Sequence, residues 1–259
     1  MLADARDLTG RLREDRARHG ILLLGLDFDG TLAPIVPRPE DAALPAETRA
    51  LLEALADRPD THVALISGRG LADLRGRVGL AGVFYAGNHG LEIEGPGVHR
   101  VHPEAVAATG RLAETAGRLR ERFGAVPGVI VEDKGLTLSV HYRLVEDPAE
   151  GAGIARQVRA LCEAVPDLRV TDGKKVVEIR PDVEWHKGRA LSFLSASLLE
   201  GHANAPVVFI GDDRTDEDAF RVVGDGGCAV VVGDPPADTA AHAALASTTE
   251  VRRFLECLA

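Results

Sequence analysis

The chain has 259 residues, enough to bury one large hydrophobic core or two small ones. Apolar residues at 45% and charged residues at 27% are ordinary for a globular protein, and no stretch is long and apolar enough for a membrane span. The formal net charge of -10 gives no reason to expect nucleic acid or an anionic membrane surface as a partner. The three cysteines lack metal-ligand spacing and the N-terminus lacks the apolar run of a secretion signal, so we expect a cytoplasmic protein.

The first predicted elements lead to a pair of carboxylates. Leucines at helical spacing predict a surface helix over residues 2–19, and the apolar run 22–26 predicts a buried strand of a parallel sheet. Asp27 and Asp29 follow directly, and both can point from the carboxyl end of the strand because alternate residues of an extended chain share a face. Open α/β sheets bind ligands at that edge. A simple acidic turn would show the same spacing. Two carboxylates at one place repel each other, however, so their pairing indicates a bound cation or a catalytic role.

Two further strands end in polar sequences. A helix and a strand over residues 62–66 precede the sequence SGR, which contains Ser67 and Arg69. A hydroxyl, backbone N–H groups and a cation suit a phosphate oxygen, although a serine that caps a helix would explain the same residues. A third strand over residues 83–86 ends in GNHG, which contains His89.

The middle of the chain changes character. A charged amphipathic helix over residues 104–123 leads to two strand-like runs around a hairpin turn, and a helix over 148–165 leads to a second such pair. The order helix–strand–strand, repeated once, predicts an αββαββ domain with its helices on one face of a sheet. Because this order differs from the flanking βα units, we interpret residues 103–182 as an insertion into a domain formed by residues 1–102 and 183–259.

The last quarter returns to alternating strands and helices. Lys187 stands before a predicted helix over residues 188–199, and a strand over 206–210 consists almost wholly of apolar residues. The sequence GDDRTDED follows this strand and contains Asp212, Asp213 and Asp216. Carboxylate oxygens at the end of such a strand suit a divalent cation, although a solvated acidic loop would have the same composition.

These segments occur in the order of the motifs of the haloacid-dehalogenase-like phosphohydrolases, a family that the chain resembles. The resemblance implies a Rossmann-like three-layer α/β core with a parallel sheet and an inserted αββαββ cap of the C2 type. It implies an aspartyl-phosphate mechanism, with Asp27 as nucleophile and Asp29 as general acid and then base. Ser67 and Lys187 would complete the catalytic set, as contacts of the phosphoryl group. Mg²⁺ would be held by Asp27, Asp29 through its backbone carbonyl, and Asp212.

A narrower resemblance, to the trehalose-6-phosphate phosphatases, spans about residues 21–232. It rests on the strings DFDGTLAPI, AGNHGLEI, VEDKGLTLSVHYR, GKKVVEIRP and IGDDRTDEDAF. It implies hydrolysis of trehalose 6-phosphate, the last step of trehalose biosynthesis, and functional coupling to a trehalose-6-phosphate synthase. Asp213 and Asp216 match the acidic pattern of the larger family and would orient the ion from behind its direct ligands. The residues that would bind the substrate are Arg69, His89, Glu132, Lys134, His141, Arg143, Lys174 and Glu178.

Several alternatives stay open from the sequence. Charge pairing across an exposed sheet would also explain the charged residues of the inserted domain. The substrate could be another sugar phosphate, such as sucrose 6-phosphate or the phosphate of a trehalose-like pseudo-disaccharide. A phosphomutase on the same scaffold and a non-enzymatic sugar-phosphate sensor are the other candidates. The presence of Asp27, Asp29 and Lys187 argues against the sensor.

Overall fold

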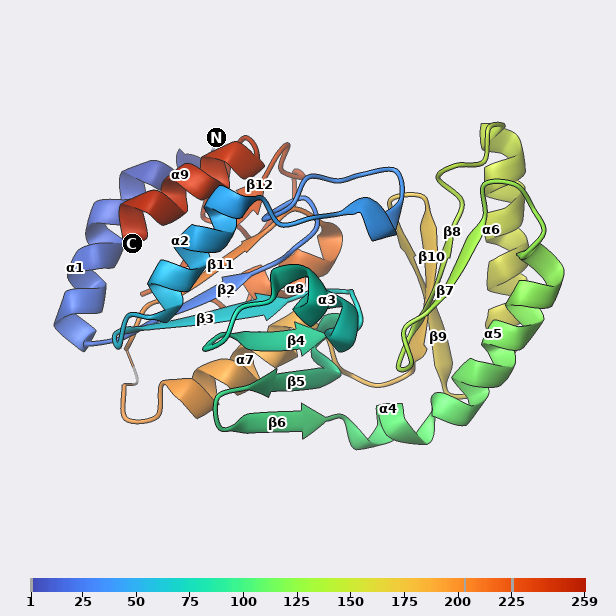
Figure 1. Ribbon diagram of the computed structural model, residues 1–259, viewed down its shortest axis with the longest axis horizontal. Helices are drawn as coiled ribbons and strands as arrows, with labels where there is room; N and C mark the ends of the chain where they lie inside the picture. The colour runs from blue at the N-terminus through green and yellow to red at the C-terminus, as the bar shows by residue number, and fades with distance from the viewer. Residues whose placement is uncertain (1, 203, 225) are drawn as a thin grey trace. The chain divides into compact units, whose positions relative to one another are not determined.

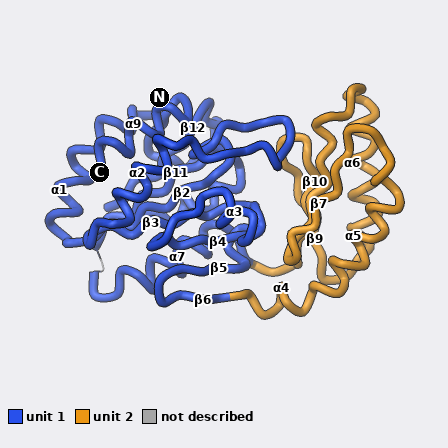
Figure 2. The backbone as a smooth tube through the Cα atoms, in the orientation of Figure 1, with its two compact units in different colours: residues 1–100, 185–259 blue, residues 101–184 orange. Residues whose placement is uncertain are grey.

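The structure is a computed structural model, and it describes residues 2–202, 204–224 and 226–259. The chain divides into two compact units, one formed by residues 1–100 and 185–259 and the other by residues 101–184 (Figure 2). The expected insertion, residues 103–182, lies within the second unit. Each unit has a sheet and a hydrophobic core of its own.

The sheet of the first unit has nine strands in the order β1-β13-β12-β11-β2-β3-β4-β5-β6. The strand pairs from β1 to β4 are parallel, and β5 pairs with β4 in the antiparallel sense. The strand β2 lies at the centre, between β11 and β3, so the motif that follows it emerges in the middle of the sheet edge. The strands are β1 (Ala3–Asp4), β2 (Leu22–Leu26), β3 (Thr61–Ile66), β4 (Phe84–Gly87), β5 (Glu92–Gly95), β6 (Val98–Val101), β11 (Val207–Gly211), β12 (Cys228–Val232) and β13 (Ala243–Leu245).

Helices cover both faces of this sheet, which makes three layers (Figure 1). Leu22 and Leu24 of β2 belong to one hydrophobic cluster and Leu23 to the other, because alternate residues of a strand point to opposite faces. One face packs against α1 (Thr9–His19), α2 (Ala46–Ala56), α3 (Leu71–Val78) and α9 (Thr248–Leu258), and the other against α7 (Lys187–Leu198) and α8 (Glu217–Phe220). None of the helices in the described ranges is long and apolar enough to cross a membrane.

The second unit is a four-stranded antiparallel sheet in the order β7-β8-β10-β9. Its strands are β7 (Ile130–Asp133), β8 (Leu138–His141), β9 (Leu168–Gly173) and β10 (Val176–Pro181), and its helices are α4 (Pro103–Ala107), α5 (Thr109–Phe123) and α6 (Pro148–Cys162). The helices α5 and α6 pack on one face of the sheet (Figure 1). Leu119 and Val158 of these helices belong to one hydrophobic cluster with Val140 and Val177 of the sheet. The predicted fold class, a parallel α/β core with an αββαββ insertion, is confirmed.

Some predicted elements were wrong in extent. The first helix begins at Thr9 rather than residue 2, because the Asp4 carboxylate accepts the Arg6 N–H and caps a short 3₁₀ turn instead. The helix expected over residues 104–123 is two helices that meet at Ala108. There the Thr109 hydroxyl donates to the Val106 carbonyl, which competes with the backbone ladder.

The sequence did not indicate the strands β5, β6 and β13. The first two form a hairpin around Gly95-Pro96-Gly97, a typical turn composition, and Gly97 has a φ of 71°. The third has three residues, too few for a periodicity to be visible.

The chain leaves and re-enters the first unit at one place. Arg100 is the last residue before the second unit, and Trp185 is the first residue after it. The Arg100 guanidinium carbon lies 3.9 Å from the centroid of the Trp185 ring and 5.1 Å from that of Phe193, distances typical of cation–π contacts. The Trp185 Nε1–H donates to the Gly90 carbonyl at 2.7 Å, which ties the pair to the turn after β4.

Candidate active site

The acidic residues of the first unit meet at the carboxyl edge of its sheet. Asp27 follows β2 and Asp212 follows the neighbouring strand β11, and the Asp27 N–H donates to the Ile210 carbonyl at 2.9 Å. Asp27, Asp212 and Asp216 each offer one carboxylate oxygen, and the three oxygens lie within 4.8 Å of one another. Residues far apart along the chain thus form one group, because parallel strands end at the same edge.

Lys187 supplies the positive charge of this group. Its ammonium donates to Asp27 Oδ1 at 2.7 Å and to Asp216 Oδ1 at 2.6 Å, and its side chain is only 3% exposed. Burial disfavours the charged form, but the Asp216 and Asp27 carboxylates raise the pKa of Lys187 above its usual range. The lysine therefore stays a cation, in contact with both carboxylates.

Asp216 organises the loop that carries Asp212. One of its oxygens accepts from Lys187, and the other accepts the backbone N–H groups of Asp212 and Asp213 at 3.1 and 3.0 Å. Asp216 is fully buried, and Asp213 caps the short helical turn that follows by accepting the Arg214 N–H. Because both oxygens of Asp216 are engaged, its carboxylate is better suited to orient the site than to ligate an ion directly.

The remaining donors fit a hard divalent cation. Burial raises the pKa of Asp27 well above its usual range. The Lys187 ammonium lowers this pKa, and the negative charges of Asp216 and Asp212 raise it further. A cation beside Asp27 and Asp212 would offset that excess negative charge. Gly30 leaves room for this arrangement, since a Cβ atom at this position would lie 2.3 Å from Asp212 Oδ2.

The Asp29 carboxylate is not a member of this acidic group. It forms a two-fold ion pair with Arg69, with Nε to Oδ2 at 2.6 Å and Nη2 to Oδ1 at 2.7 Å. Arg69 also donates to Asp73 Oδ2 at 2.8 Å and to the Pro39 carbonyl at 3.0 Å. The sequence placed Asp29 and Arg69 in one site but did not indicate that they would bind each other.

Two loops bring Ser67 and His89 together in the same unit. The His89 N–H donates to the Ser67 carbonyl at 2.8 Å, and the His89 ring packs so closely on Gly68 that a Cβ there would lie 2.9 Å from it. His89 has a φ of 58°, and the neighbouring Asn88 has a φ of 50°, a left-handed conformation that costs energy for residues other than glycine. Such strain concentrates at functional sites, so it marks this turn as a candidate part of the site.

Glu92 holds these two loops in place and was missed from the sequence. Its Oε1 atom accepts the Leu71 N–H and the Asn88 side-chain amide, each at 2.8 Å. Glu92 is the glutamate of the string AGNHGLEI, which was the only sequence signal for it.

The second unit holds a separate group of charged residues on the face of its sheet opposite the helices. The Lys134 ammonium lies 3.8 Å from a Glu132 oxygen and 3.9 Å from a Glu178 oxygen. The His141 Nε2 atom lies 2.9 Å from Glu132 Oε2. Lys174 and Arg143 meet at one end of the same sheet, where the Arg143 guanidinium donates to the Lys174 carbonyl at 3.0 Å.

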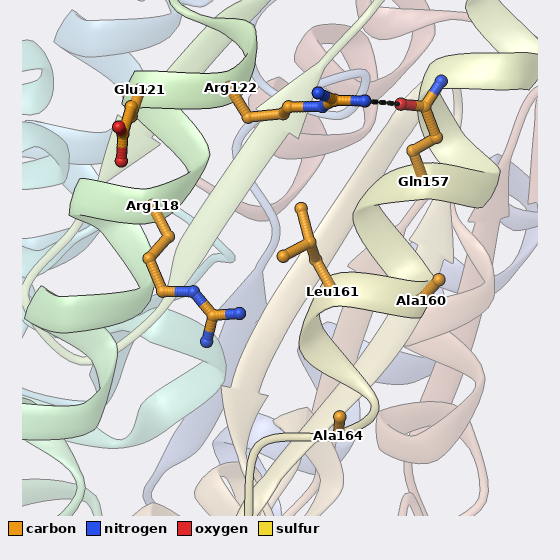
Figure 3. Close-up of a pocket in the computed structure, with 7 residues that line it drawn as sticks. All are labelled: Arg118, Glu121, Arg122, Gln157, Ala160, Leu161 and Ala164. Atoms are coloured by element: carbon orange, nitrogen blue, oxygen red, sulfur yellow. Dashed lines mark hydrogen bonds between the residues drawn. The ribbon is translucent and has the colours of Figure 1, made fainter.

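A groove of about 770 Å³ lies on the helical side of the second unit, between α5 and α6 (Figure 3). The Arg122 guanidinium donates to Gln157 Oε1 across it at 3.1 Å, and Leu161 lies below (Figure 3). None of the residues expected to act in catalysis or sugar binding lines this groove. The groove is therefore distinct from both groups of site residues.

Comparison with known proteins fits this arrangement of motifs. A sequence model of the family described as trehalose-phosphatase matches residues 25–249. The chain belongs to the trehalose-phosphatase family. It is 44% identical over 239 residues to a trehalose-phosphate phosphatase of Mycobacterium marinum, an alignment that covers 90% of this chain and 60% of that protein.

Solved structures give the same result for the fold. The C-terminal domain of a Candida albicans trehalose-6-phosphate phosphatase superposes with a TM-score of 0.81 at 25% identity, over 100% of this chain and 98% of that one. A haloacid dehalogenase-like hydrolase from Bacteroides thetaiotaomicron superposes with a TM-score of 0.61 at 19% identity, over 91% and 98%. The chain spans about 60% of the length of this mycobacterial relative. All of the site residues named above lie inside the range that the trehalose-phosphatase family model matches.

Proposed function

We propose that this chain is a phosphatase that hydrolyses trehalose 6-phosphate to trehalose and inorganic phosphate. The observation that carries the proposal is the buried group of Asp27, Lys187 and Asp216 at the sheet edge of a trehalose-phosphatase family member. A buried carboxylate in contact with a lysine suits attack on a phosphoryl group, because the cation offsets the charge that both reactants carry.

The chemistry divides into two steps. Asp27 attacks phosphorus, the bond from phosphorus to the sugar oxygen breaks, and Asp29 gives that oxygen a proton. Asp29 then takes a proton from water as the water attacks the aspartyl phosphate, which releases phosphate and restores Asp27. Both carboxylate oxygens of Asp29 accept hydrogen bonds from Arg69, so this contact has to rearrange when substrate binds for Asp29 to reach the leaving oxygen. Arg69 can then contact the substrate.

Ser67, Lys187 and His89 would hold the phosphoryl group and the neighbouring part of the substrate. Ser67 is 1% exposed and lies one strand over from Asp27. Mg²⁺, when bound, would screen the charge between carboxylate and phosphate. Asp27, Asp212 and the Asp29 carbonyl would hold it, with Asp213 and Asp216 behind them.

Specificity would come from the inserted domain. We assign residues 1–102 and 183–259 as the catalytic core and residues 103–182 as the cap that selects the sugar. Glu132, Lys134 and Glu178 form one charged group on the sheet of that domain, and Lys174 and Arg143 form a second. Charged groups form strong hydrogen bonds with hydroxyls, which suits a ligand made almost wholly of hydroxyl groups.

Release of phosphate from a panel of substrates tests the proposal. The panel contains trehalose 6-phosphate, sucrose 6-phosphate, glucose 6-phosphate and p-nitrophenyl phosphate, each with Mg²⁺ and with a chelator. We expect the highest kcat/KM on trehalose 6-phosphate and no turnover in chelator. Preference for another sugar phosphate would move the assignment to that sugar, and transfer of phosphate to an added sugar phosphate would indicate a phosphomutase.

Two further parts of the proposal concern the setting of the enzyme. We propose a cytoplasmic location, in line with the three cysteines, which are free thiols. We also propose functional coupling to a trehalose-6-phosphate synthase, the kind of enzyme that would supply the substrate.

A further inference from the structure

A row of four polar side chains crosses the sheet of the second unit from one edge to the other. Glu132 of β7 is paired with Ser139 of β8, Ser139 with Glu178 of β10, and Glu178 with Thr171 of β9. Residues paired in register point to the same face, so carboxylate and hydroxyl alternate along the row. The neighbouring row, with Val140 and Val177, points to the opposite face and packs with the helices.

The two hydroxyls of this row are buried without a hydrogen-bond partner among the described residues. Ser139 is 1% exposed, and neither its Oγ atom nor the Oγ1 atom of Thr171 makes a hydrogen bond to the described part of the chain. Most buried side-chain hydroxyls in folded proteins are hydrogen-bonded, because a hydroxyl that loses its hydrogen bonds to water without gaining others destabilises the fold. Two such hydroxyls in one row indicate that a ligand supplies the missing partners.

The surroundings of the row select the chemistry of that ligand. The Lys134 ammonium lies between the Glu132 and Glu178 carboxylates, 3.8 and 3.9 Å from them, and His141 contacts Glu132. Two carboxylates beside the hydroxyls repel an anion such as a phosphate group. A neutral ligand with many hydroxyls fits, because each of its hydroxyls can donate to a carboxylate and exchange a hydrogen bond with a serine or threonine.

We propose that Ser139 and Thr171 bind hydroxyl groups of the sugar and extend the recognition site beyond the charged residues. The proposal rests on the function proposed above. The strand β10 separates the two residues, so their Cα atoms are two inter-strand spacings apart, about 9.6 Å. One hexose ring is too small to reach both. The row therefore binds the two rings of a disaccharide, with Ser139 forming a hydrogen bond to one ring and Thr171 to the other.

Substitutions that remove only the hydroxyl test this assignment. The variants are Ser139→Ala and Thr171→Val, and the control is Thr115→Val, which removes a buried hydroxyl on helix α5. Each of the two site variants should lower the ratio of kcat/KM on trehalose 6-phosphate to that on p-nitrophenyl phosphate about tenfold, the size expected for one hydrogen bond. The control should keep the wild-type ratio. On glucose 6-phosphate, with its single ring, only one of the two site variants should lower kcat/KM.

Thermal unfolding gives a second readout, which a merely structural role would not produce. Without ligand, Ser139→Ala should unfold at the same temperature as the wild type or a higher one, because it removes an unmatched buried polar group. The rise in unfolding temperature caused by added trehalose should shrink in Ser139→Ala and in Thr171→Val, and should persist in Thr115→Val.

An unchanged substrate ratio in both site variants, or equal losses on trehalose 6-phosphate and p-nitrophenyl phosphate, would overturn the assignment. A wild-type enzyme that does not cleave trehalose 6-phosphate would instead overturn the proposed function. In that case, calorimetric titration of the same variants with trehalose and with glucose still tests the row. Equal affinity in the wild type and both site variants would refute it.

Discussion

The buried charges around Lys187 make two substitutions respond in opposite ways. Asp27→Asn removes the nucleophile, and we expect a rate loss of about 10⁶, the size seen when a protease loses its nucleophile. The fold should survive, because the cluster of two carboxylates and one ammonium becomes a balanced pair of Lys187 and Asp216. Lys187→Met leaves the two carboxylates buried without their cation, and should cost about 3–5 kcal/mol of unfolding free energy.

Steady-state kinetics with Mg²⁺ and urea denaturation in chelator check both variants. The exposed Asp238→Asn is the matched control and should behave as the wild type in both measurements. Activity of Asp27→Asn within tenfold of the wild type would exclude the aspartyl-phosphate mechanism.

The absence of a side chain at Gly30 leaves the space that the Asp212 carboxylate occupies. Gly30 has a φ of 84°, and a methyl group there would overlap Asp212. Gly30→Ala should therefore raise the Mg²⁺ concentration for half-maximal activity at least tenfold. Gly20→Ala is the matched control, since Gly20 has a φ of 75° and a methyl group added there would have nothing within 4 Å.

Both alanine variants should lose about 1–2 kcal/mol of stability, because both place alanine in the left-handed region. Only Gly30→Ala should change the metal requirement, which a titration of activity with Mg²⁺ measures. Equal metal requirements in the two variants would show that Asp212 is not a ligand.

Among the elements, helix α3 links the fold to the site through Asp73. Its carboxylate accepts from Arg69 at 2.8 Å and from Arg77 at 2.9 Å. Burial opposes the ionised form, but the hydrogen bonds from Arg77 and Arg69 hold the pKa of Asp73 below its ordinary value. A carboxylate whose pKa is lowered in the folded state stabilises the protein at any pH above its unfolded-state pKa, which is about 4. This stabilisation disappears as the pH falls through the folded-state pKa.

Asp73→Asn should accordingly be less stable than the wild type at pH 7, and the difference should shrink as the pH falls below about 4. Urea unfolding between pH 7 and pH 3 measures this, with the exposed Asp57→Asn as control. A constant difference across that range would mean that Asp73 acts only through packing.

The elements also differ in how far the sequence could predict them. The strand β2 and its carboxylates were visible, because an apolar run followed by two aspartates is a local pattern. The contacts from Lys187 to Asp27 and from Arg69 to Asp29 join residues 160 and 40 positions apart, so only the order of the strands creates them. The unmatched hydroxyl of Ser139 has no signal in the sequence, since its meaning comes from the two strands beside it.

For the whole molecule, the proposed roles of the two units as catalytic core and cap give a further prediction. Glu132→Ala should lower kcat/KM on trehalose 6-phosphate about ten- to a hundredfold, because a hydrogen bond to a charged group contributes about 1.5–3 kcal/mol. On p-nitrophenyl phosphate, which has no sugar, the loss should be much smaller. Glu121→Ala, on the groove between α5 and α6, is the control in the same unit. Equal losses on both substrates would mean that Glu132 only supports the fold.

The contact between Arg100 and Trp185 makes the second unit a cassette. The chain departs at one of these residues and returns at the other, and their side chains stack on each other. Insertions are tolerated best where the two ends lie close together. A sheet protein could therefore acquire, lose or exchange such a unit at this point without rebuilding its core, and so could keep one chemistry while its lineage changed the molecule on which it acts.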